Sequence, residues 1–252
     1  MKKLSPQNVI PGFHAVMDTL CYNPSQIKEI YLIKENRSAR IEKIIKIAYL
    51  KNIPVHFLDS SDMLHSFRNL SHQGVLALLH EFQYKSLDNV IADVFRKQGR
   101  GLLIAVDHIT DEGNLGSIMR TAGFFSADGL IIPKDRSARI SARVLKSASG
   151  VHNRLSVVRV VNLARCLTVL SKNGFWVIGT GIHGRSVYEF DWDMDIVLVL
   201  GNEQKGISPS IKRICHDIVG IPSPNRIDSL NVAVAEGIIL SEIYRQMSHL
   251  SS

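Results

Sequence analysis

Residues 101–122 read GLLIAVDHITDEGNLGSIMRTA, and this segment indicates the fold class of the chain. Residues 102–106 form an uninterrupted apolar run of strand length, which is typical of a strand covered on both faces of a parallel sheet. A helical pattern follows, in which Asn114 stands near the start and Arg120 comes six residues later. Two glycines flank Asn114 and permit a tight turn with close backbone approach. A buried strand that leads into a helix predicts an α/β domain.

The C-terminal part of the chain repeats this alternation of strand and helix. Short apolar runs recur at residues 130–132, 157–160, 176–178, 197–200 and 219–221, and helical patterns separate many of them. A long helix rich in Val, Ala, Ile and Leu is predicted over residues 230–247. This order of elements favours a mostly parallel sheet covered by helices on both faces.

The N-terminal part is predicted to be a smaller α/β domain. It reads helix–strand three times, with strands expected at residues 27–33, 54–58 and 74–79. Residues 84–100 are more polar and include an amphipathic helical pattern over residues 86–95. We therefore expect two domains, residues 1–83 and 84–252, with a linker at about residues 84–100.

Composition limits the classes of function. The 252 residues include 30 Lys and Arg against 23 Asp and Glu, so the net charge of +7 mildly favours a polyanionic partner such as nucleic acid. Three widely spaced cysteines form no CxxC pair, which argues against a disulfide framework and a zinc site. No HExxH motif, signal peptide or bilayer-length apolar run is present. We expect a cytoplasmic protein without a metal.

Two further segments follow predicted strands, at the edge where open α/β sheets bind ligands. Residues 200–208 read LGNEQKGIS, in which two glycines bracket a polar turn that lacks the Lys-Ser/Thr of a phosphate loop. Residues 221–235 read IPSPNRIDSLNVAVA, in which Ser229 or Asp228 is predicted to cap the last helix. Asn231 is an unusual polar choice in the first turn of that apolar helix.

A third glycine-rich segment, residues 179–184, matches GxGxxG after an apolar strand. The dinucleotide-binding interpretation requires a helix to open next, and residues 185–195 carry no helical pattern. Nicotinamide binding is therefore disfavoured, and the glycines are better suited to bringing backbone close to a different flat ligand.

Cationic side chains gather between residues 134 and 146. Four of them are spaced 3, 4 and 3 residues apart, which predicts one helical face that could follow a phosphate backbone. The set consists of Lys134, Arg136, Arg139, Arg143 and Lys146.

The order and spacing of these segments resemble the three signature motifs of the SpoU/TrmH family, the RNA ribose 2′-O-methyltransferases of the SPOUT superfamily. The matching residues are Asn114-Leu115-Gly116 with Arg120, Leu200-Gly201-Asn202-Glu203 with Gly206, and Ile221-Pro222 with Ser229-Leu230-Asn231-Val232. Within that family the chain is most similar to the bacterial enzymes that methylate a guanosine of 23S rRNA. The resemblance extends to the N-terminal part through residues 12–16 and His72-Gln73-Gly74.

The resemblance implies a fold, a donor and partners. The C-terminal domain would be a SPOUT α/β domain with a deep trefoil knot, and the N-terminal domain an L30e-like RNA-binding domain. The protein would be a homodimer through its knotted domain, would use S-adenosylmethionine, and would bind RNA, with 23S rRNA the favoured substrate.

The resemblance also implies roles for individual residues. The catalytic set would be Arg120, Asn114, Glu203, Ser229 and Asn231. Donor contacts would come from Thr180, Gly181, Leu200, Gly201, Asn202, Ile221, Pro222, Ser229, Leu230 and Asn231. RNA contacts would come from the five cationic residues between 134 and 146 and from His72.

Arg120 is expected to act mainly by position. A free arginine is a poor base because its guanidinium holds its proton far above neutral pH, so it would fork onto the acceptor's phosphate or be made basic by a special environment. Asn114 would orient Arg120 or the ribose, and Glu203 would pair with a cation. Residues 223–228 depart from the family, whose members commonly have a Met and a Gly there.

Two alternatives stay open. A tRNA ribose 2′-O-methyltransferase belongs to the same family, although the N-terminal domain favours ribosomal RNA. A non-catalytic RNA-binding or ribosome-assembly protein is the alternative from another class, and the presence of the whole catalytic set argues against it.

Overall fold

A computed structural model describes residues 9–22, 24–35, 38–66, 72–148, 151, 155–223 and 230–249. The chain forms two compact units, Met1–Phe82 and Gln83–Ser252. In the described ranges no helix combines the length and the apolar character needed to cross a membrane.

The first unit is a four-stranded sheet with helices. Its elements are β1 (Val9–Pro11), α1 (Phe13–Tyr22), a 3-10 turn η2 (Pro24–Gln26), β2 (Ile27–Ile33), α2 (Ala39–Leu50), β3 (Val55–Leu58), α3 (Ser60–Ser66) and β4 (Val75–Leu79). The strand order is β1-β4-β2-β3, in which β2 and β3 are parallel and β4 is antiparallel to both of its neighbours. The sequence did not predict β1, because a three-residue edge strand is too short to show periodicity.

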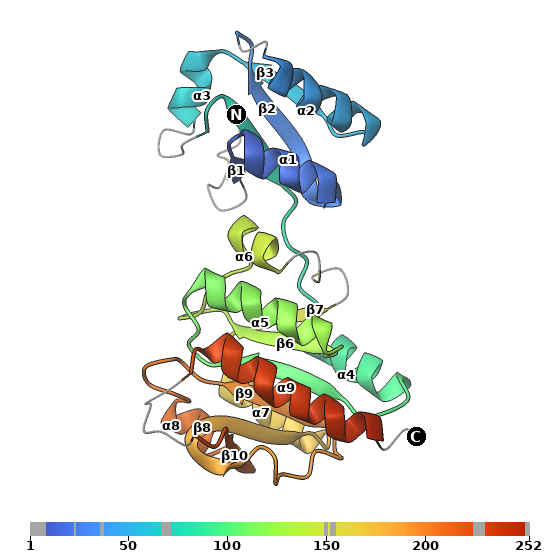
Figure 1. Cartoon of the computed structure of the whole chain (residues 1–252), viewed down its shortest axis with the longest axis vertical. Helices are drawn as coiled ribbons and strands as arrows, with labels where there is room; N and C mark the ends of the chain where they lie inside the picture. Colours follow the sequence, from blue (N-terminus) through green and yellow to red (C-terminus); the bar gives the residue numbers. More distant parts are fainter. Residues whose placement is uncertain are drawn as a thin grey trace. The chain divides into compact units, whose positions relative to one another are not determined.

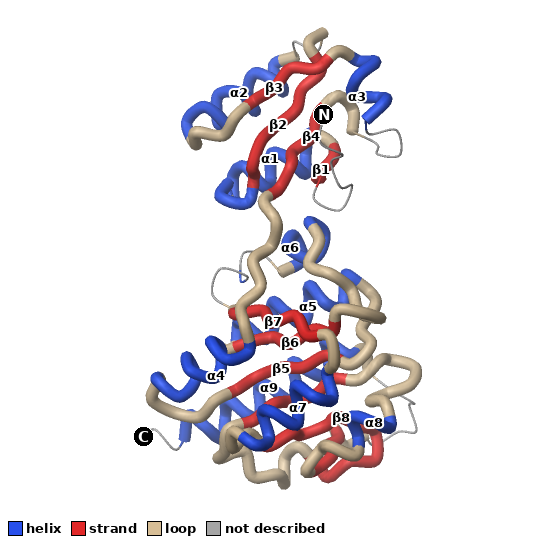
Figure 2. The backbone as a smooth tube through the Cα atoms, turned by 180° about the vertical axis from the view of Figure 1, so that it is seen from behind, coloured by secondary structure: helices blue, strands red, loops and turns tan. Residues whose placement is uncertain are grey.

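The second unit is a three-layer α/β domain. Its elements are α4 (Leu87–Arg96), β5 (Leu102–Val106), α5 (Glu112–Phe124), β6 (Gly129–Pro133), α6 (Ala142–Ser147), β7 (Ser156–Val160), α7 (Leu163–Lys172), β8 (Trp176–Ser186), β9 (Ile196–Leu200), α8 (Pro209–Lys212), β10 (Asp217–Gly220) and α9 (Val232–His249). The sheet has the order β10-β8-β9-β5-β6-β7, and each neighbouring pair is parallel. Helices α5 and α9 lie on the face seen in Figure 1, and α4 and α7 cover the opposite face in Figure 2. The predicted parallel sheet with two covered faces is confirmed.

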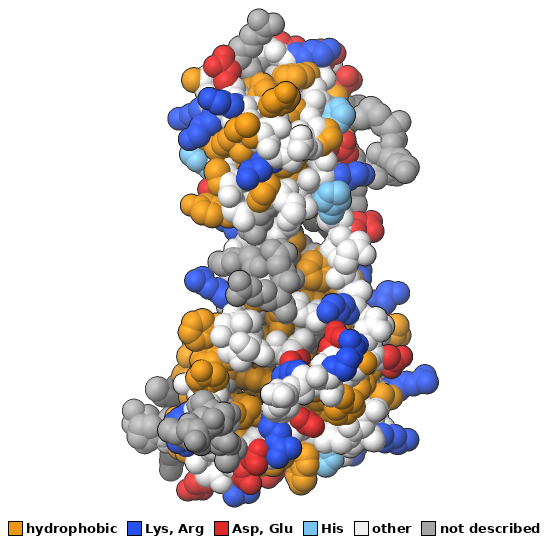
Figure 3. Space-filling view, turned by 90° about the vertical axis from the view of Figure 1, so that its right-hand side faces the viewer, with side chains coloured by type: hydrophobic (Ala, Val, Ile, Leu, Met, Phe, Trp, Pro, Cys, Tyr) orange, Lys and Arg blue, Asp and Glu red, His pale blue; other side chains and the backbone are white. Residues whose placement is uncertain are grey.

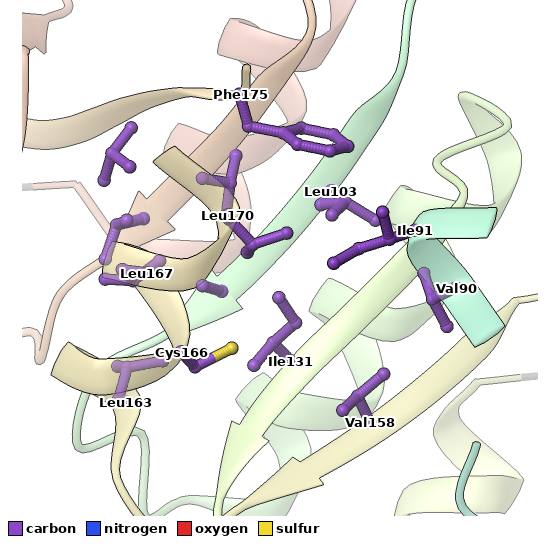
Figure 4. Packing of buried hydrophobic residues seen from close by; sticks show 14 of the residues in the cluster. Val90, Ile91, Leu103, Ile131, Val158, Leu163, Cys166, Leu167, Leu170 and Phe175 are labelled. Atoms are coloured by element: carbon purple, nitrogen blue, oxygen red, sulfur yellow. The ribbon is translucent and has the colours of Figure 1, made fainter. Parts of the chain in front are cut away.

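The core beneath α4 and α7 holds this unit together (Figure 4). Leu167 and Leu170 of α7 and Val90 and Ile91 of α4 pack against alternate strand residues such as Leu103. Burial raises the pKa of the Cys166 thiol in this layer to about 12, so that the thiol stays protonated and acts as a small apolar side chain.

The expected linker at about residues 84–100 is corrected by this packing. Ser86 caps α4 by accepting a hydrogen bond from the Asn89 amide, and Val90, Ile91 and Val94 are buried in the core of the second unit. The polar residues that suggested a linker are the solvent-facing side of an amphipathic helix.

The cationic residues between 134 and 146 do not share one helical face as their spacing predicted. Helix α6 contains only Arg143 and Lys146, and Arg136 lies in a turn with a φ of 55°. All five side chains are nevertheless exposed. A spacing of three and four residues aligns side chains only where the backbone is helical, and here the helix begins after Ser141.

Candidate active site

The carboxyl ends of four parallel strands meet at one edge of the second unit's sheet. Strands β10, β8, β9 and β5 are consecutive neighbours there. All the glycine-bearing segments that the sequence singled out follow or interrupt these strands. Parallel α/β sheets bind ligands at this edge, so the sequence motifs converge where the fold allows a site.

The turn after β9 is closed on itself. Asn202 and Gly206 exchange two backbone hydrogen bonds of 3.0 and 2.7 Å, and the Asn202 side chain accepts bonds from the amides of Gln204 and Lys205. A Cβ atom on Gly201 would lie 2.4 Å from backbone atoms of Gly206 and Ile207. Only glycine fits at position 201, and the packed turn presents backbone to a ligand.

Strand β8 carries the second part of the site. Its register against β10 shifts so that Gly179 pairs with Ile218 while Arg185 pairs with Val219, which leaves the intervening residues as an excursion from the ladder. The Thr180 hydroxyl donates a 3.0 Å bond to the Val199 carbonyl in β9. The GxGxxG segment therefore lies within a strand and opens no helix, in agreement with the sequence interpretation.

The excursion lies against the end of β10. A Cβ on Gly220 would lie 2.5 Å from the carbonyl oxygen of Gly181. Ile221 and Pro222 follow Gly220 directly, so two of the expected donor-contact segments are neighbours. Leu200 is 1% exposed and its carbonyl accepts the Asp107 amide, so its side chain offers a ligand no surface.

Three side chains far apart in the sequence form one hydrogen-bonded network. The Asn114 side-chain amide donates to Glu203 Oε1, and Asn231 Nδ2 donates to Asn114 Oδ1 at 2.9 Å and to Glu203 Oε1 at 3.1 Å. The network joins the start of α5, the turn after β9 and the start of α9. Glu203 therefore accepts from two neutral amides, which corrects the expectation that it pairs with a cation.

Helix capping explains how two of these residues are held. Asp111 caps α5 by accepting a 2.8 Å bond from the Asn114 amide. Asn231 caps α9, because its Oδ1 accepts from the amide of Ala233 at 3.0 Å. The first helical residue is Val232, directly after Asn231, whereas Ser229 and Asp228, the predicted caps, lie outside the described residues. An Asn that both caps a helix and donates to Glu203 explains the polar residue in this turn.

Residues 224–229 lie outside the described residues, and the expected roles of Ser229 in catalysis and donor binding stay predictions. Leu230, which follows them, is 47% exposed beside Asn231. An exposed leucine at the start of α9 is compatible with an apolar contact to a ligand.

Arg120 lies apart from this network. Its side chain is exposed on α5, and it makes no hydrogen bond or ion pair with the described residues. Asn114 is hydrogen-bonded to Glu203 and Asn231 and not to Arg120, and its expected role in orienting Arg120 or the ribose stays a prediction. The guanidinium is left available to an incoming phosphate.

Sequence reasoning missed Asp107 and His108, which come directly after β5. The Asp107 carboxylate is 3% exposed; its Oδ1 lies 2.6 Å from His108 Nδ1 and its Oδ2 accepts the Ser208 amide at 2.7 Å. The His108 side chain is 42% exposed. The sequence signal was available, since an acidic residue and a histidine end a buried strand at the ligand-binding edge.

The cationic segment is hydrogen-bonded to Ile109, the residue after Asp107 and His108. The Ser137 hydroxyl and the Ala138 amide both donate to the Ile109 carbonyl, at 3.1 and 2.8 Å. Arg136 and Arg139 flank these two residues and are exposed. Basic side chains thus adjoin the site through a loop rather than through the expected helix.

His72 is not presented to RNA. It is 8% exposed, and its Nδ1 accepts the Gly74 amide at 3.1 Å in the turn before β4. The motif His72-Gln73-Gly74 thus shapes a turn, with φ values of 46° at Gln73 and 81° at Gly74. Across the described residues no group of three or more His, Cys, Asp or Glu side chains could hold a metal ion.

Fold and site together define a class, the α/β methyltransferases in which three separated motifs meet at one sheet edge. A family described as the SpoU rRNA Methylase family matches residues 101–241, and one described as RNA 2'-O ribose methyltransferase substrate binding matches residues 9–85. The chain belongs to the SpoU rRNA methylase family.

Relatives agree over nearly the whole chain. The 23S rRNA (guanosine-2'-O-)-methyltransferase RlmB of Pseudomonas aeruginosa is 34% identical over 98% of this chain and 100% of its own. The TrmH/SpoU tRNA modifying enzyme of A. aeolicus is 29% identical with a TM-score of 0.56, over 66% of this chain and 84% of its own. The SpoU methyltransferase AviRb of Streptomyces viridochromogenes, solved with AdoMet, has a TM-score of 0.69 at 22% identity over 97% of this chain and 91% of its own, which shows the fold.

Proposed function

We propose that this protein transfers a methyl group from S-adenosylmethionine to a ribose 2′-hydroxyl of RNA. The observation that carries the proposal is the network of Asn114, Glu203 and Asn231, which fixes three family motifs at one sheet edge. A non-catalytic RNA-binding protein would not need these amide groups and this carboxylate to be held together.

The site suits a flat nucleoside with an amino-acid tail. A Cβ on Gly201 would lie 2.4 Å from the backbone of Gly206 and Ile207, and one on Gly220 2.5 Å from the Gly181 carbonyl, so these turns pack main chain on main chain and can offer a nucleoside backbone groups as partners. We assign the donor contacts to the backbone of residues 180–181, 200–202, 221–222 and 230–231. Ser229, which directly precedes Leu230 in the sequence, is assigned to the donor as well. When bound, the donor supplies an activated methyl group on a sulfonium.

Arg120 is assigned to the acceptor. Its exposed guanidinium has no partner among the described residues and would fork onto a phosphate next to the target ribose. Holding the hydroxyl in line with the methyl group is worth on the order of 7–11 kcal/mol of the barrier when both reactants are well oriented. Position is therefore the main contribution expected of this chain.

The favoured substrate is a guanosine of 23S rRNA. Support comes from the Pseudomonas aeruginosa relative, whose whole length aligns with this chain. The tRNA modifying enzyme aligns with only 66% of the chain, so it gives no account of the first unit. We assign that unit, an L30e-like domain, to RNA binding. An enzyme of this kind would work in the cytoplasm, where the RNA is.

The second unit is proposed to dimerise and to be knotted. Apolar side chains are exposed on α5 and α9, with Phe124 78%, Val234 51% and Tyr244 58% exposed, and a second copy would cover them. The chain leaves β10 at one edge of the sheet, and α9 then packs on α5. This path is compatible with a knot in which the chain after β9 passes through a loop. Analytical ultracentrifugation of the protein and of Phe124→Glu tests the dimer, and a crystal structure traced through residues 200–232 tests the knot.

The test of the activity is a transfer assay with isotopically labelled S-adenosylmethionine. Purified protein is incubated with 23S rRNA, with tRNA and with no RNA, and ribose methylation is mapped on the product. We expect label at a single 23S rRNA guanosine and none in tRNA. Label in tRNA alone would favour the second substrate, and donor binding without transfer to any RNA would favour the non-catalytic alternative.

A further inference from the structure

We propose that His108, held by Asp107, is the group that accepts the proton of the ribose 2′-hydroxyl during methyl transfer. The inference rests on the proposed function. The 2′-oxygen bonds to the methyl carbon, the carbon–sulfur bond breaks with its electron pair going to sulfur, and the hydroxyl proton moves to Nε2 of His108. With His108 as the proton acceptor, the atoms and charges of the step balance without any further reactant.

The pair has the geometry of an oriented base. Asp107 Oδ1 lies 2.6 Å from His108 Nδ1, while Asp107 Oδ2 accepts the Ser208 amide at 2.7 Å. A buried carboxylate beside Nδ1 favours the tautomer with its proton on Nδ1, which leaves the lone pair on Nε2. Since Asp107 is 3% and His108 42% exposed, the carboxylate is fixed inside the protein while the imidazole reaches solvent.

His108 lies between the two parts of the site that the substrate must bridge. Its carbonyl accepts a 3.0 Å bond from Asn202 Nδ2, in the turn assigned to the donor. Its neighbour Ile109 accepts bonds from Ser137 and Ala138, in the loop that carries Arg136 and Arg139. If the phosphates of a nucleotide lie along the cationic loop and its ribose faces the donor, the nucleotide lies beside His108.

The other groups near this edge are poorer bases. Glu203 Oε1 already accepts from two amides, Asp107 is buried, and the guanidinium of Arg120 has no acceptor lone pair. The charged residues of the adjoining segments are Asp111 and Glu112 at the start of α5, Glu203 and Lys205 in the turn after β9, and Lys134, Asp135, Arg136 and Arg139 in the cationic loop.

The experiment compares His108→Gln and His108→Arg with the unsubstituted protein. Single-turnover methylation of 23S rRNA is measured at saturating donor and RNA between pH 5.5 and 8.5. We expect a rate that rises with pH in the unsubstituted protein, and in both variants a rate lower by roughly 100-fold, the lower end of general-base effects. The pH dependence between 5.5 and 7.5 should be lost in His108→Gln.

The two variants separate a proton acceptor from a phosphate contact. Arginine can contact a phosphate but accepts no proton, so a normal rate in His108→Arg would overturn the proposal, as would a normal rate and pH profile in His108→Gln. Calorimetry with S-adenosylhomocysteine should show unchanged donor affinity in both variants. The exposed His80, in the first unit, provides the control His80→Ala, which should leave the pH profile unchanged.

Failure of the proposed function would look different. If the unsubstituted protein neither bound S-adenosylhomocysteine nor methylated RNA, the proposed function would fall, and the role of His108 with it. A working enzyme whose rate is indifferent to His108 would overturn the role of His108 alone.

Discussion

Glu236 is a carboxyl group placed among apolar side chains. It lies on the same side of α9 as Val232, Leu240 and Ile243, and all four are buried. Neither carboxyl oxygen of Glu236 has a hydrogen-bond partner among the described residues, and burial raises its pKa well above the ordinary value of 4.5. The group is therefore held protonated in the folded protein at a pH where the unfolded chain has lost the proton.

Glu236→Met should stabilise the protein, and more so at high pH. Folding takes up a proton at Glu236, so the wild-type stability is highest below the unfolded pKa of 4.5 and falls as pH rises toward the raised folded pKa. An unbranched thioether fills the same space without a polar group. We expect the free energy of unfolding to rise by about 1–3 kcal/mol at pH 8, with a smaller gain at pH 5, in urea titrations at both pH values.

Glu236→Gln is the matched control. It keeps a buried polar group but cannot ionise, so its stability should lack this pH dependence while gaining less than Glu236→Met. Equal gains for Met at pH 5 and pH 8 would show that folding does not raise the pKa of Glu236.

Gly201 and Gly206 allow a test of the donor turn. Gly201→Ala places a Cβ 2.4 Å from backbone, whereas Gly206, with a φ of 65°, has open space around its Cβ position. We expect Gly201→Ala to weaken S-adenosylhomocysteine binding by at least about tenfold, or 1.4 kcal/mol. Gly206→Ala should cost roughly 1 kcal/mol of stability from left-handed backbone and keep its affinity. Calorimetry and thermal melts check both, and equal affinities in the two variants would remove Gly201 from the donor site.

The regular elements were largely predictable, because their signals are local. The strands at residues 102–106 and 196–200 show as apolar runs, and the face of α4 shows as a helical period. The start of α9 could not be predicted to the residue, because Ser229, Asp228 and Asn231 are all good caps and only the structure shows that the helix begins at Val232. The excursion of β8 was not predictable, since it depends on register against β10, a strand about forty residues later.

Asn231 serves α9 and the site at once, and two substitutions separate these roles. Asn231→Ala removes both the cap and the donated bonds, at about 1 kcal/mol for the cap. Asn231→Asp keeps an acceptor for the Ala233 amide but cannot donate to Glu203, and it adds a second carboxylate there. We expect both variants to lose most methyl-transfer activity, with the Asp variant retaining more helix stability in melts followed by circular dichroism. A fully active Asp variant would show that the donated bonds are dispensable.

Contacts between residues far apart in the sequence were beyond the reach of local sequence patterns. The family motifs pointed to the segments that carry Asn114, Glu203 and Asn231, but the contacts between these residues span 89 and 117 positions, and no local pattern encodes such pairings. Charge was equally uninformative for RNA binding. On the face seen in Figure 3, Lys and Arg side chains are interspersed with Asp and Glu rather than gathered into one field.

Residues 83–252 alone should fold and bind the donor but hold RNA weakly. The second unit has its own core, and the described part of every proposed donor contact lies within it, whereas Val9, Met63, Leu76 and Leu78 form a separate cluster in the first unit. We expect donor affinity equal to that of the full chain by calorimetry, and RNA affinity at least tenfold lower by fluorescence anisotropy. The residual RNA binding should fall with salt, because the exposed cationic residues between 134 and 146 remain. Undiminished affinity of the fragment for 23S rRNA would contradict the assignment of the first unit to RNA binding, while loss of donor binding in a folded fragment would mean that the donor site needs both units.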